Sequence, residues 1–247
     1  MSGGPRVAVV GATGAVGRVM FEVLAARGFE ASELVPFASE RSAGRELSGI
    51  GTVQPLHTDT VGGFDIALFS AGGATSREWA PQFAAAGAIV VDNSSAWRMD
   101  PQVPLVVSEV NPDALERIER GIVANPNCTT MTIMLPLKAL HDRFGLREMV
   151  ATSFQAAGGA GQKGMDELAE QVPLLHSDRE RLISNGAEAL AAIEHSVHAA
   201  PLAYNVVPWL GSDAGDGYSD EEIKLVNESR KILDLPDLRV SPTCVRV

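Results

Sequence analysis

The chain opens with an apolar run that gives way to a helical pattern. Residues 6–10 form a short β-branched run, typical of a buried parallel strand, and a glycine-rich turn follows at 11–17. Apolar side chains then recur at helical spacing, at positions 16, 19, 20, 23 and 24. This order predicts a strand, a tight turn and a helix.

Strand-like and helix-like segments keep alternating after this point. We expect strands at 34–38, 66–69, 88–91 and 121–124 and a helix at about 74–86. Short, glycine-rich turns join them, which predicts an α/β fold with a doubly wound, Rossmann-type parallel sheet. A helix from Cys128 to about Phe144 and an alternating strand at 149–155 follow. We therefore place one domain at 1–127 and a second at 128–247.

The turn at 11–17 lies where a strand meets the N-terminus of a helix. Gly11, Gly14 and Gly17 leave the backbone open there, so a phosphate group can approach it and meet the helix N-terminus. This context favours a dinucleotide site, and an ordinary tight turn between strand and helix is the alternative.

The loop after the second strand bears on the choice of dinucleotide. An acidic residue there binds the free 2′-hydroxyl of NAD, whereas Arg and hydroxyl side chains suit the 2′-phosphate of NADP. Glu40 keeps NAD open, but Arg41 between Ser39 and Ser42 favours NADP. The alternative is a solvated polar loop.

Two further loops follow strands of the predicted sheet. Ser70 to Gly73 lies at the carboxyl end of a strand, where a cofactor is expected. The segment 92–98 occupies the equivalent place after the next strand and ends in Arg98. Arg98 is therefore a candidate anion contact, with a surface ion pair as the alternative.

Cys128 follows an apolar strand and stands at the start of a predicted helix. A helix N-terminus presents unpaired N–H groups and the positive end of the helix dipole, and both favour a thiolate nucleophile. Asn127 is placed to cap this helix. The alternative is a small buried residue in a strand-to-helix turn.

Composition narrows the possible functions. A chain of 247 residues holds one large domain or two ordinary ones. Its net charge of −11 argues against nucleic acid and anionic membranes as general partners. No apolar stretch is long enough for a membrane span and two cysteines make no disulfide framework, so we expect a cytoplasmic protein.

Several of these motifs occur together in one family. The chain resembles the aspartate-β-semialdehyde dehydrogenase family in its turn at 11–17, its loops at 39–44 and 92–98, the Asn-Pro-Asn-Cys-Thr-Thr motif at 125–130 and the segment 153–161. The match continues at 221–224, 228–233 and 241–246. N-acetyl-glutamyl-phosphate reductase and glyceraldehyde-3-phosphate dehydrogenase share the cysteine-on-a-helix plan, but the approach to Cys128 and the Gln155 strand favour the aspartate enzyme.

The resemblance implies a role for each matching residue. Cys128 becomes the acylating nucleophile, Gln155 its partner in positioning the thioester, and Asn127 a group that orients the acyl carbon. The implied substrate contacts are Arg246 for the α-carboxylate, Glu221 for the ammonium, and Lys224 with Arg98 for the phosphate. Glu221 and Lys224 lie three apart on a predicted helix, so a surface ion pair is the alternative for them.

The implied enzyme is an NADP(H)-dependent oxidoreductase that converts L-aspartyl-4-phosphate to L-aspartate 4-semialdehyde, in the biosynthesis of lysine and diaminopimelate, methionine and threonine. The second domain is then the catalytic and dimerisation domain, and a homodimer is expected. No metal is expected. The predicted cofactor contacts are Gly11, Thr13, Gly14, Ala15, Val16, Gly17, Ser39, Arg41, Ser42, Ser70, Gly72, Gly73 and Gly158.

One expected group has no match. In the family a histidine follows the substrate-binding arginine, but this sequence ends one residue after Arg246 and its five histidines lie in other motifs. From this comparison we expect a C-terminally truncated chain with an incomplete α+β second domain and impaired turnover. Alternative functions are an N-acetyl-glutamyl-phosphate reductase-like enzyme and a noncatalytic NADP-binding module.

Overall fold

The computed structural model describes residues 3–247, which divide into two compact units. Unit 1 runs to Phe144 and also takes in Glu228–Pro236, whereas unit 2 contains Gly145–Asn227 and Asp237–Val247. The division after Phe144 differs from the boundary expected at Cys128, because the helix that begins at Cys128 groups with the sheet before it.

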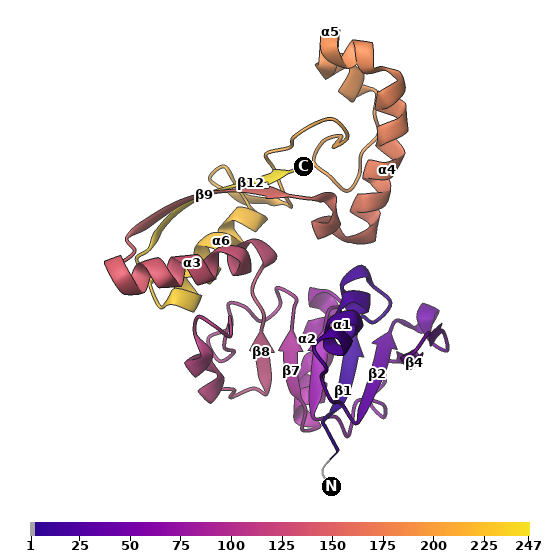
Figure 1. Cartoon of the computed structure of the whole chain (residues 1–247), viewed down its shortest axis with the longest axis vertical. Coiled ribbons are helices and arrows are strands. Elements are labelled where there is room, and N and C mark those ends of the chain that lie inside the picture. Colours follow the sequence, from indigo (N-terminus) through magenta and orange to yellow (C-terminus); the bar gives the residue numbers. More distant parts are fainter. Residues whose placement is uncertain (1–2) are drawn as a thin grey trace. The chain divides into compact units, whose positions relative to one another are not determined.

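Unit 1 is built on a six-stranded parallel sheet (Figure 1). Its order is β5-β2-β1-β6-β7-β8, so the chain proceeds from β1 to both edges and the predicted doubly wound sheet is confirmed. A short hairpin of β3 and β4 stands beside it. The strands are β1 (Arg6–Val10), β2 (Glu33–Ala38), β3 (Glu46–Leu47), β4 (Gly51–Thr52), β5 (Gln54–Pro55), β6 (Ile66–Phe69), β7 (Ile89–Asp92) and β8 (Ile122–Ala124).

The helices of unit 1 begin at the expected places. They are α1 (Ala15–Ala26), α2 (Gly73–Ala85) and α3 (Cys128–Phe144), with short 3-10 turns at Glu40–Ser42 and Pro112–Glu116. The buried face of α1 differs from its apolar pattern, because Gly17 and Phe21 are buried while Val16, Val19 and Val23 are about half exposed. Gly17 allows this close approach, since a Cβ there would lie 2.2 Å from the carbonyl oxygen of Gly11.

Aromatic side chains fill the space between α2 and the sheet. Phe83 of α2 packs edge-to-face on Phe37 of β2 and Phe69 of β6, with ring centroids 5.7 and 5.4 Å apart. Phe64 closes the group at 5.6 Å from Phe37. Such pairs contribute about 0.5–1.5 kcal/mol each beyond the apolar area that they bury. This cluster fixes the helix whose N-terminus follows the loop at 70–72.

Unit 2 contains a two-stranded parallel sheet, β9 (Glu148–Gln155) with β12 (Arg239–Arg246). The other elements are the 3-10 turn at Ala157–Ala160, the helices α4 (Gly161–Ser177) and α5 (Arg179–Ala191), and the hairpin of β10 (Asp213–Gly215) and β11 (Tyr218–Ser219). Leu175 of α4 and Ala189 of α5 pack together with Ala203. The helix α6 (Asp220–Leu233) is shared, with its residues up to Asn227 in unit 2 and the rest in unit 1.

Within residues 3–247 no helix combines the length and the apolar character needed to cross a membrane.

Candidate active site

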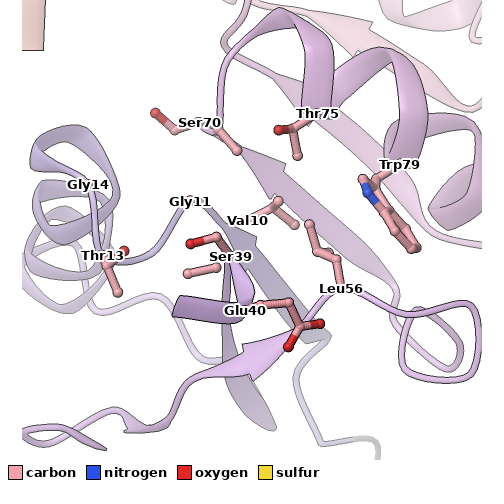
Figure 2. A pocket seen from close by; sticks show the side chains of 12 residues that line it. Val10, Gly11, Thr13, Gly14, Ser39, Glu40, Leu56, Ser70, Thr75 and Trp79 are labelled. Atoms are coloured by element: carbon pink, nitrogen blue, oxygen red, sulfur yellow. The ribbon is translucent and has the colours of Figure 1, made fainter. Parts of the chain in front are cut away.

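A cleft of about 500 Å³ lies at the carboxyl ends of the strands of unit 1 (Figure 2). Five of the predicted cofactor residues line it, namely Gly11, Thr13, Gly14, Ser39 and Ser70. Figure 2 shows Thr13 and Gly14 at one end of the cleft and Leu56 and Trp79 at the other. The cleft therefore joins the glycine turn, the loop after β2 and the start of α2 in one space.

The glycine turn is shaped for a group larger than a side chain. Gly11 has a φ of 92°, and a Cβ at this position would lie 2.4 Å from the carbonyl oxygen of Ser70. Gly14 precedes α1 without a side-chain cap, so the first N–H groups of the helix remain available to an anion. The residues present thus fit the pyrophosphate of a dinucleotide.

Glu40 rather than Arg41 lines the cleft beside Ser39. The Glu40 carboxylate lies 3.1 Å from the ring of His57, and Arg41 is exposed in the same 3-10 turn. Three cleft residues lie outside the strand ends and loops that were predicted to surround the cofactor: Leu56, Thr75 and Trp79. Thr75 and Trp79 lie four apart on α2, and residues at this spacing share one face of a helix. This spacing could have shown from the sequence that both side chains reach the cleft.

Cys128 is exposed and is the first residue of α3. Asn127 caps the helix, because its side-chain Oδ1 accepts the main-chain N–H of Thr129 at 2.8 Å. The first turn holds no acidic residue, so the thiol meets the positive end of the helix dipole without a carboxylate in that turn. The side-chain hydroxyls of Thr129 and Thr130 are buried without a partner among the described residues.

Arg98 is buried in unit 1 beside this helix start. Its guanidinium donates to the carbonyl oxygens of Asn125 and Asn93, at 2.9 and 3.0 Å, and to the carboxylate of Glu228 at 3.0 Å. These bonds use three of its five N–H donors, which leaves two within the described part of the chain for an anion. The alternative of a surface ion pair is therefore wrong in one respect, because the pair of Arg98 with Glu228 is buried.

The predicted substrate residues of unit 2 share a pocket of about 450 Å³. Glu221, Lys224 and Arg246 line it, together with the segment 196–199 and residues 209–211. Lys224 also pairs with Glu221 at 3.3 Å and with Asp220 at 2.7 Å, so the ion-pair alternative and the pocket location both hold. Burial lowers the pKa of Lys224, but the hydrogen bond to Asp220 and the charges of Glu221 and Asp220 outweigh it, and the pKa lies above its ordinary value.

Gln155 and Arg246 face each other at the ends of β9 and β12, where the strand register pairs them. The Gln155 amide donates to the hydroxyl of Ser153 at 3.1 Å. Arg246 is buried and donates to the carbonyl of Ala156 at 2.7 Å. Gly159 makes room for it, since a Cβ at Gly159 would lie 2.8 Å from the guanidinium.

His198 also lines this pocket, which the sequence did not predict. Its ring is buried, and Nε2 lies 3.1 Å from the carbonyl oxygen of Gly164. A carbonyl only accepts, so this contact assigns the proton to Nε2. Between residues 3 and 247 no group of three His, Cys, Asp or Glu side chains is arranged to hold a metal ion.

The remaining predicted residues fall into two groups. Ala15, Val16, Gly17, Gly72 and Gly73 lie at the starts of α1 and α2 next to the cleft, and Ser42 ends the 3-10 turn that holds Arg41. Gly158 belongs to unit 2, in the turn before α4.

Comparison with known proteins matches both halves of the chain. A profile described as semialdehyde dehydrogenase, NAD binding domain, matches residues 6–118, and one described as semialdehyde dehydrogenase, dimerisation domain, matches residues 137–247. Together with the parallel sheet and its glycine-lined cleft, these matches define a dehydrogenase that uses a nicotinamide cofactor.

Individual relatives specify the family. The chain is 53% identical over 244 residues to the aspartate-semialdehyde dehydrogenase of Streptomyces akiyoshiensis and 50% identical over 249 residues to that of Corynebacterium glutamicum. Each alignment covers 98% of this chain and 72% of the relative. The crystal structure of aspartate semialdehyde dehydrogenase II complexed with ASA from Vibrio cholerae superposes with a TM-score of 0.88 at 40% identity, covering 100% of this chain and 71% of that one. The chain belongs to the aspartate-semialdehyde dehydrogenase family.

Proposed function

We propose that this protein catalyses the NADP-dependent reductive dephosphorylation of L-aspartyl-4-phosphate to L-aspartate 4-semialdehyde. The observation that supports it most directly is Cys128, an exposed thiol at the capped start of α3 in a chain of this family. The role follows from chemistry, because an acyl phosphate needs a nucleophile that forms a thioester and later leaves from it.

Cys128 reacts as a thiolate, after its proton has been released. Its sulfur attacks the 4-acyl carbon, a C–S bond forms, the bond from that carbon to the phosphate oxygen breaks, and inorganic phosphate leaves. The glycine turn at 11–17 would hold NADPH, which would supply the hydride for reduction of the thioester carbonyl carbon and leave as NADP⁺. Reduction gives the oxyanion of a thiohemiacetal on Cys128, and as its C=O bond forms the C–S bond breaks, which releases the aldehyde and restores the thiolate.

The charged side chains are complementary to the charges of this substrate. We assign Arg246 to the α-carboxylate, Glu221 to the ammonium group, and Lys224 with Arg98 to the phosphate. A dianionic phosphate beside a carboxylate needs several cations, and an amino acid also needs one anion. The presence of Glu221, Lys224 and Arg246 around one pocket supports this assignment. Gln155, paired in register with Arg246, would position the thioester, and Asn127 would orient the acyl carbon besides capping α3.

For the cofactor we propose NADP, with Arg41, Ser39 and Ser42 at the 2′-phosphate and the glycine turn at the pyrophosphate. Ala15, Val16 and Gly17 would present N–H groups at the start of α1, with Thr13, Ser70, Gly72, Gly73 and Gly158 completing the site. The Vibrio cholerae relative was crystallised with ASA, and we extend that substrate to this chain. The product would serve the biosynthesis of lysine and diaminopimelate, methionine and threonine.

The test combines thiol labelling with turnover. At neutral pH, iodoacetamide should modify Cys128 at least tenfold faster than the buried Cys244, and aspartate semialdehyde with phosphate should slow the reaction. The Cys128→Ser variant should lose phosphate-dependent NADP reduction but still bind the cofactor. Equal, slow labelling of both cysteines would favour a noncatalytic NADP-binding module, and turnover of N-acetyl-glutamyl phosphate in preference to aspartyl phosphate would favour the related reductase.

A further inference from the structure

Glu228 carries a buried carboxylate that none of the predicted roles uses. Its side chain is 2% exposed, and its two oxygens have different partners in unit 1. Oε1 accepts from the Arg98 guanidinium at 3.0 Å, and Oε2 accepts the main-chain N–H of Asn127 at 2.6 Å. One carboxylate thus contacts both Asn127, the residue immediately before Cys128, and Arg98, which we expect to bind an anion.

The partners of Glu228 are themselves held in place. Arg98 is fixed at three points, and Asn127 caps α3 through its side chain. One turn further along α6, the ammonium group of Lys231 donates to the carbonyl oxygens of Arg98, Asp100 and Val103 at 2.7, 2.8 and 2.9 Å. The end of α6 therefore holds both loops that carry the candidate nucleophile and the candidate anion contact.

Only a carboxylate satisfies this arrangement. Both partners are donors and one carries a full charge, so the bridging group must accept twice and neutralise a buried cation. A Gln side chain of the same shape has one accepting oxygen and one donating nitrogen. It would leave one donor unpaired and the charge of Arg98 without a counterion.

We propose that Glu228 is the positioning residue of the nucleophile: it locks the main chain before Cys128 and the guanidinium of Arg98 into one geometry and neutralises Arg98. The inference rests on the proposed function, because it concerns the setting of Cys128 and Arg98. Glu228 acts through these two residues and does not touch the substrate.

Two alkylating reagents, applied to the full chain, test whether Glu228 neutralises the charge of Arg98 near Cys128. Iodoacetamide is neutral and iodoacetate is an anion of similar size, so the ratio of their rates at Cys128 reports the local potential independently of how much thiolate is present. In Glu228→Gln the uncompensated Arg98 should raise the relative rate of iodoacetate at least threefold. A loss of packing alone would change both rates by the same factor.

Glu222→Gln is the matched control. Glu222 is also a buried carboxylate of α6, but it accepts from Ser219 and from the main-chain N–H of Cys244 in unit 2. This variant should keep the iodoacetate preference of Cys128 within twofold of the unsubstituted chain. If Glu228→Gln does not fold, Glu228→Asp keeps the charge but shortens the bridge. Glu228→Asp should leave the iodoacetate preference of Cys128 within twofold of the unsubstituted chain. It should also speed hydrogen exchange of the main-chain N–H of Asn127 at least tenfold.

The outcomes separate this inference from the proposed function. Slow labelling of Cys128 in the unsubstituted chain, no faster than Cys244, would overturn both. Fast labelling of Cys128 with an unchanged reagent ratio in Glu228→Gln would overturn the role of Glu228 alone. If only Glu228→Asp folds, an unchanged rate of hydrogen exchange at the main-chain N–H of Asn127 would likewise overturn the role of Glu228 alone.

Discussion

At the scale of single residues, the choice of cofactor rests on two neighbours with opposite charge. Glu40 lines the cleft and contacts His57, whereas Arg41 is exposed beside it. A carboxylate suits a free ribose hydroxyl and repels a phosphate, so Glu40 counts toward NAD. NADP binding then requires Arg41 to reach the 2′-phosphate from the edge of the cleft and to outweigh this carboxylate.

Removal of Arg41 is the direct test. Arg41→Ala should weaken NADPH binding about tenfold to a hundredfold, because a hydrogen bond to a charged group is worth about 1.5–3 kcal/mol. NADH lacks the phosphate, so its affinity should stay within twofold. Fluorescence titration of each reduced cofactor measures both constants. Arg45→Ala makes the same charge change in the neighbouring segment and should alter neither. An equal loss of both cofactors in Arg41→Ala would contradict the assignment of the 2′-phosphate to Arg41.

Residues differ in how far the sequence could predict them. Cys128 and Asn127 are readable because strand, cap and helix start follow one another along the chain, and the structure places both as expected. Glu228 was not readable as a partner of Arg98, because 130 positions separate them and only the folded chain brings them together. Long-range ion pairs leave no local periodicity in a sequence.

At the scale of elements, periodicity identified the secondary structure better than it identified the buried face. The strand, turn and helix over 6–26 were predictable because apolar runs and glycines mark each boundary. The exposure of Val16, Val19 and Val23 was not, since Gly17 sets which side of α1 approaches the sheet. A glycine contact carries no hydrophobic signal, so the apolar pattern marks the buried face only in part: Met20 packs against the buried Phe21, whereas the three valines are about half exposed.

The loop at 196–198, which lines the pocket of about 450 Å³ in unit 2, is fastened to α4 by a single carboxylate. Glu167 accepts the main-chain N–H groups of Ser196, Val197 and His198 at 2.6, 2.8 and 3.1 Å. Burial raises the pKa of Glu167, but the hydrogen bonds from Val197, Ser196 and His198 outweigh it and lower the pKa to about 2. The carboxylate form is thus favoured in the folded state.

This pKa predicts a pH-dependent contribution to stability. The folded pKa of about 2 lies below the ordinary 4.5, so the contribution is fully present above pH 4.5 and is lost as the pH falls through 2. Glu167→Gln should lower the free energy of unfolding at pH 7 by about 1 kcal/mol, since the site is partly exposed. The difference in thermal midpoint between the two proteins should shrink below pH 4.5. Glu170→Gln, one turn along α4, is the control and should show no such trend. A difference that stays constant from pH 7 to pH 3 would refute this account.

At the scale of the whole molecule, the sequence identified two regions of different character but not how the chain divides between them. The segment Glu228–Pro236 returns to unit 1 after the chain has built most of unit 2. This return depends on tertiary contacts, among them those of Glu228 and Lys231. No local sequence pattern predicts that the segment rejoins unit 1. The boundary near Cys128 was drawn from a change of pattern, whereas α3 still groups with unit 1.

The second unit also presents an apolar sheet face that fits self-association. Val150 and Phe154 lie on the same face of β9 and are 85% and 70% exposed. A two-stranded sheet is marginal in water without further packing, and the matching profile over 137–247 is described as a dimerisation domain. We therefore propose a homodimer that buries this face of β9.

Charge reversal of the apolar face tests this assembly. Phe154→Asp should raise the dimer dissociation constant at least about thirtyfold, because truncation of a central interface residue costs about 2 kcal/mol or more and a buried carboxylate adds to it. Sedimentation equilibrium measures the constant, and cofactor binding by unit 1 should persist as evidence of folding. Ile183→Asp is the matched control, since Ile183 is 87% exposed on α5, away from β9 in the sequence, and its replacement should leave the dimer intact. Dissociation in Ile183→Asp but not in Phe154→Asp would move the interface to α5, and a monomeric unsubstituted chain at all accessible concentrations would refute the homodimer.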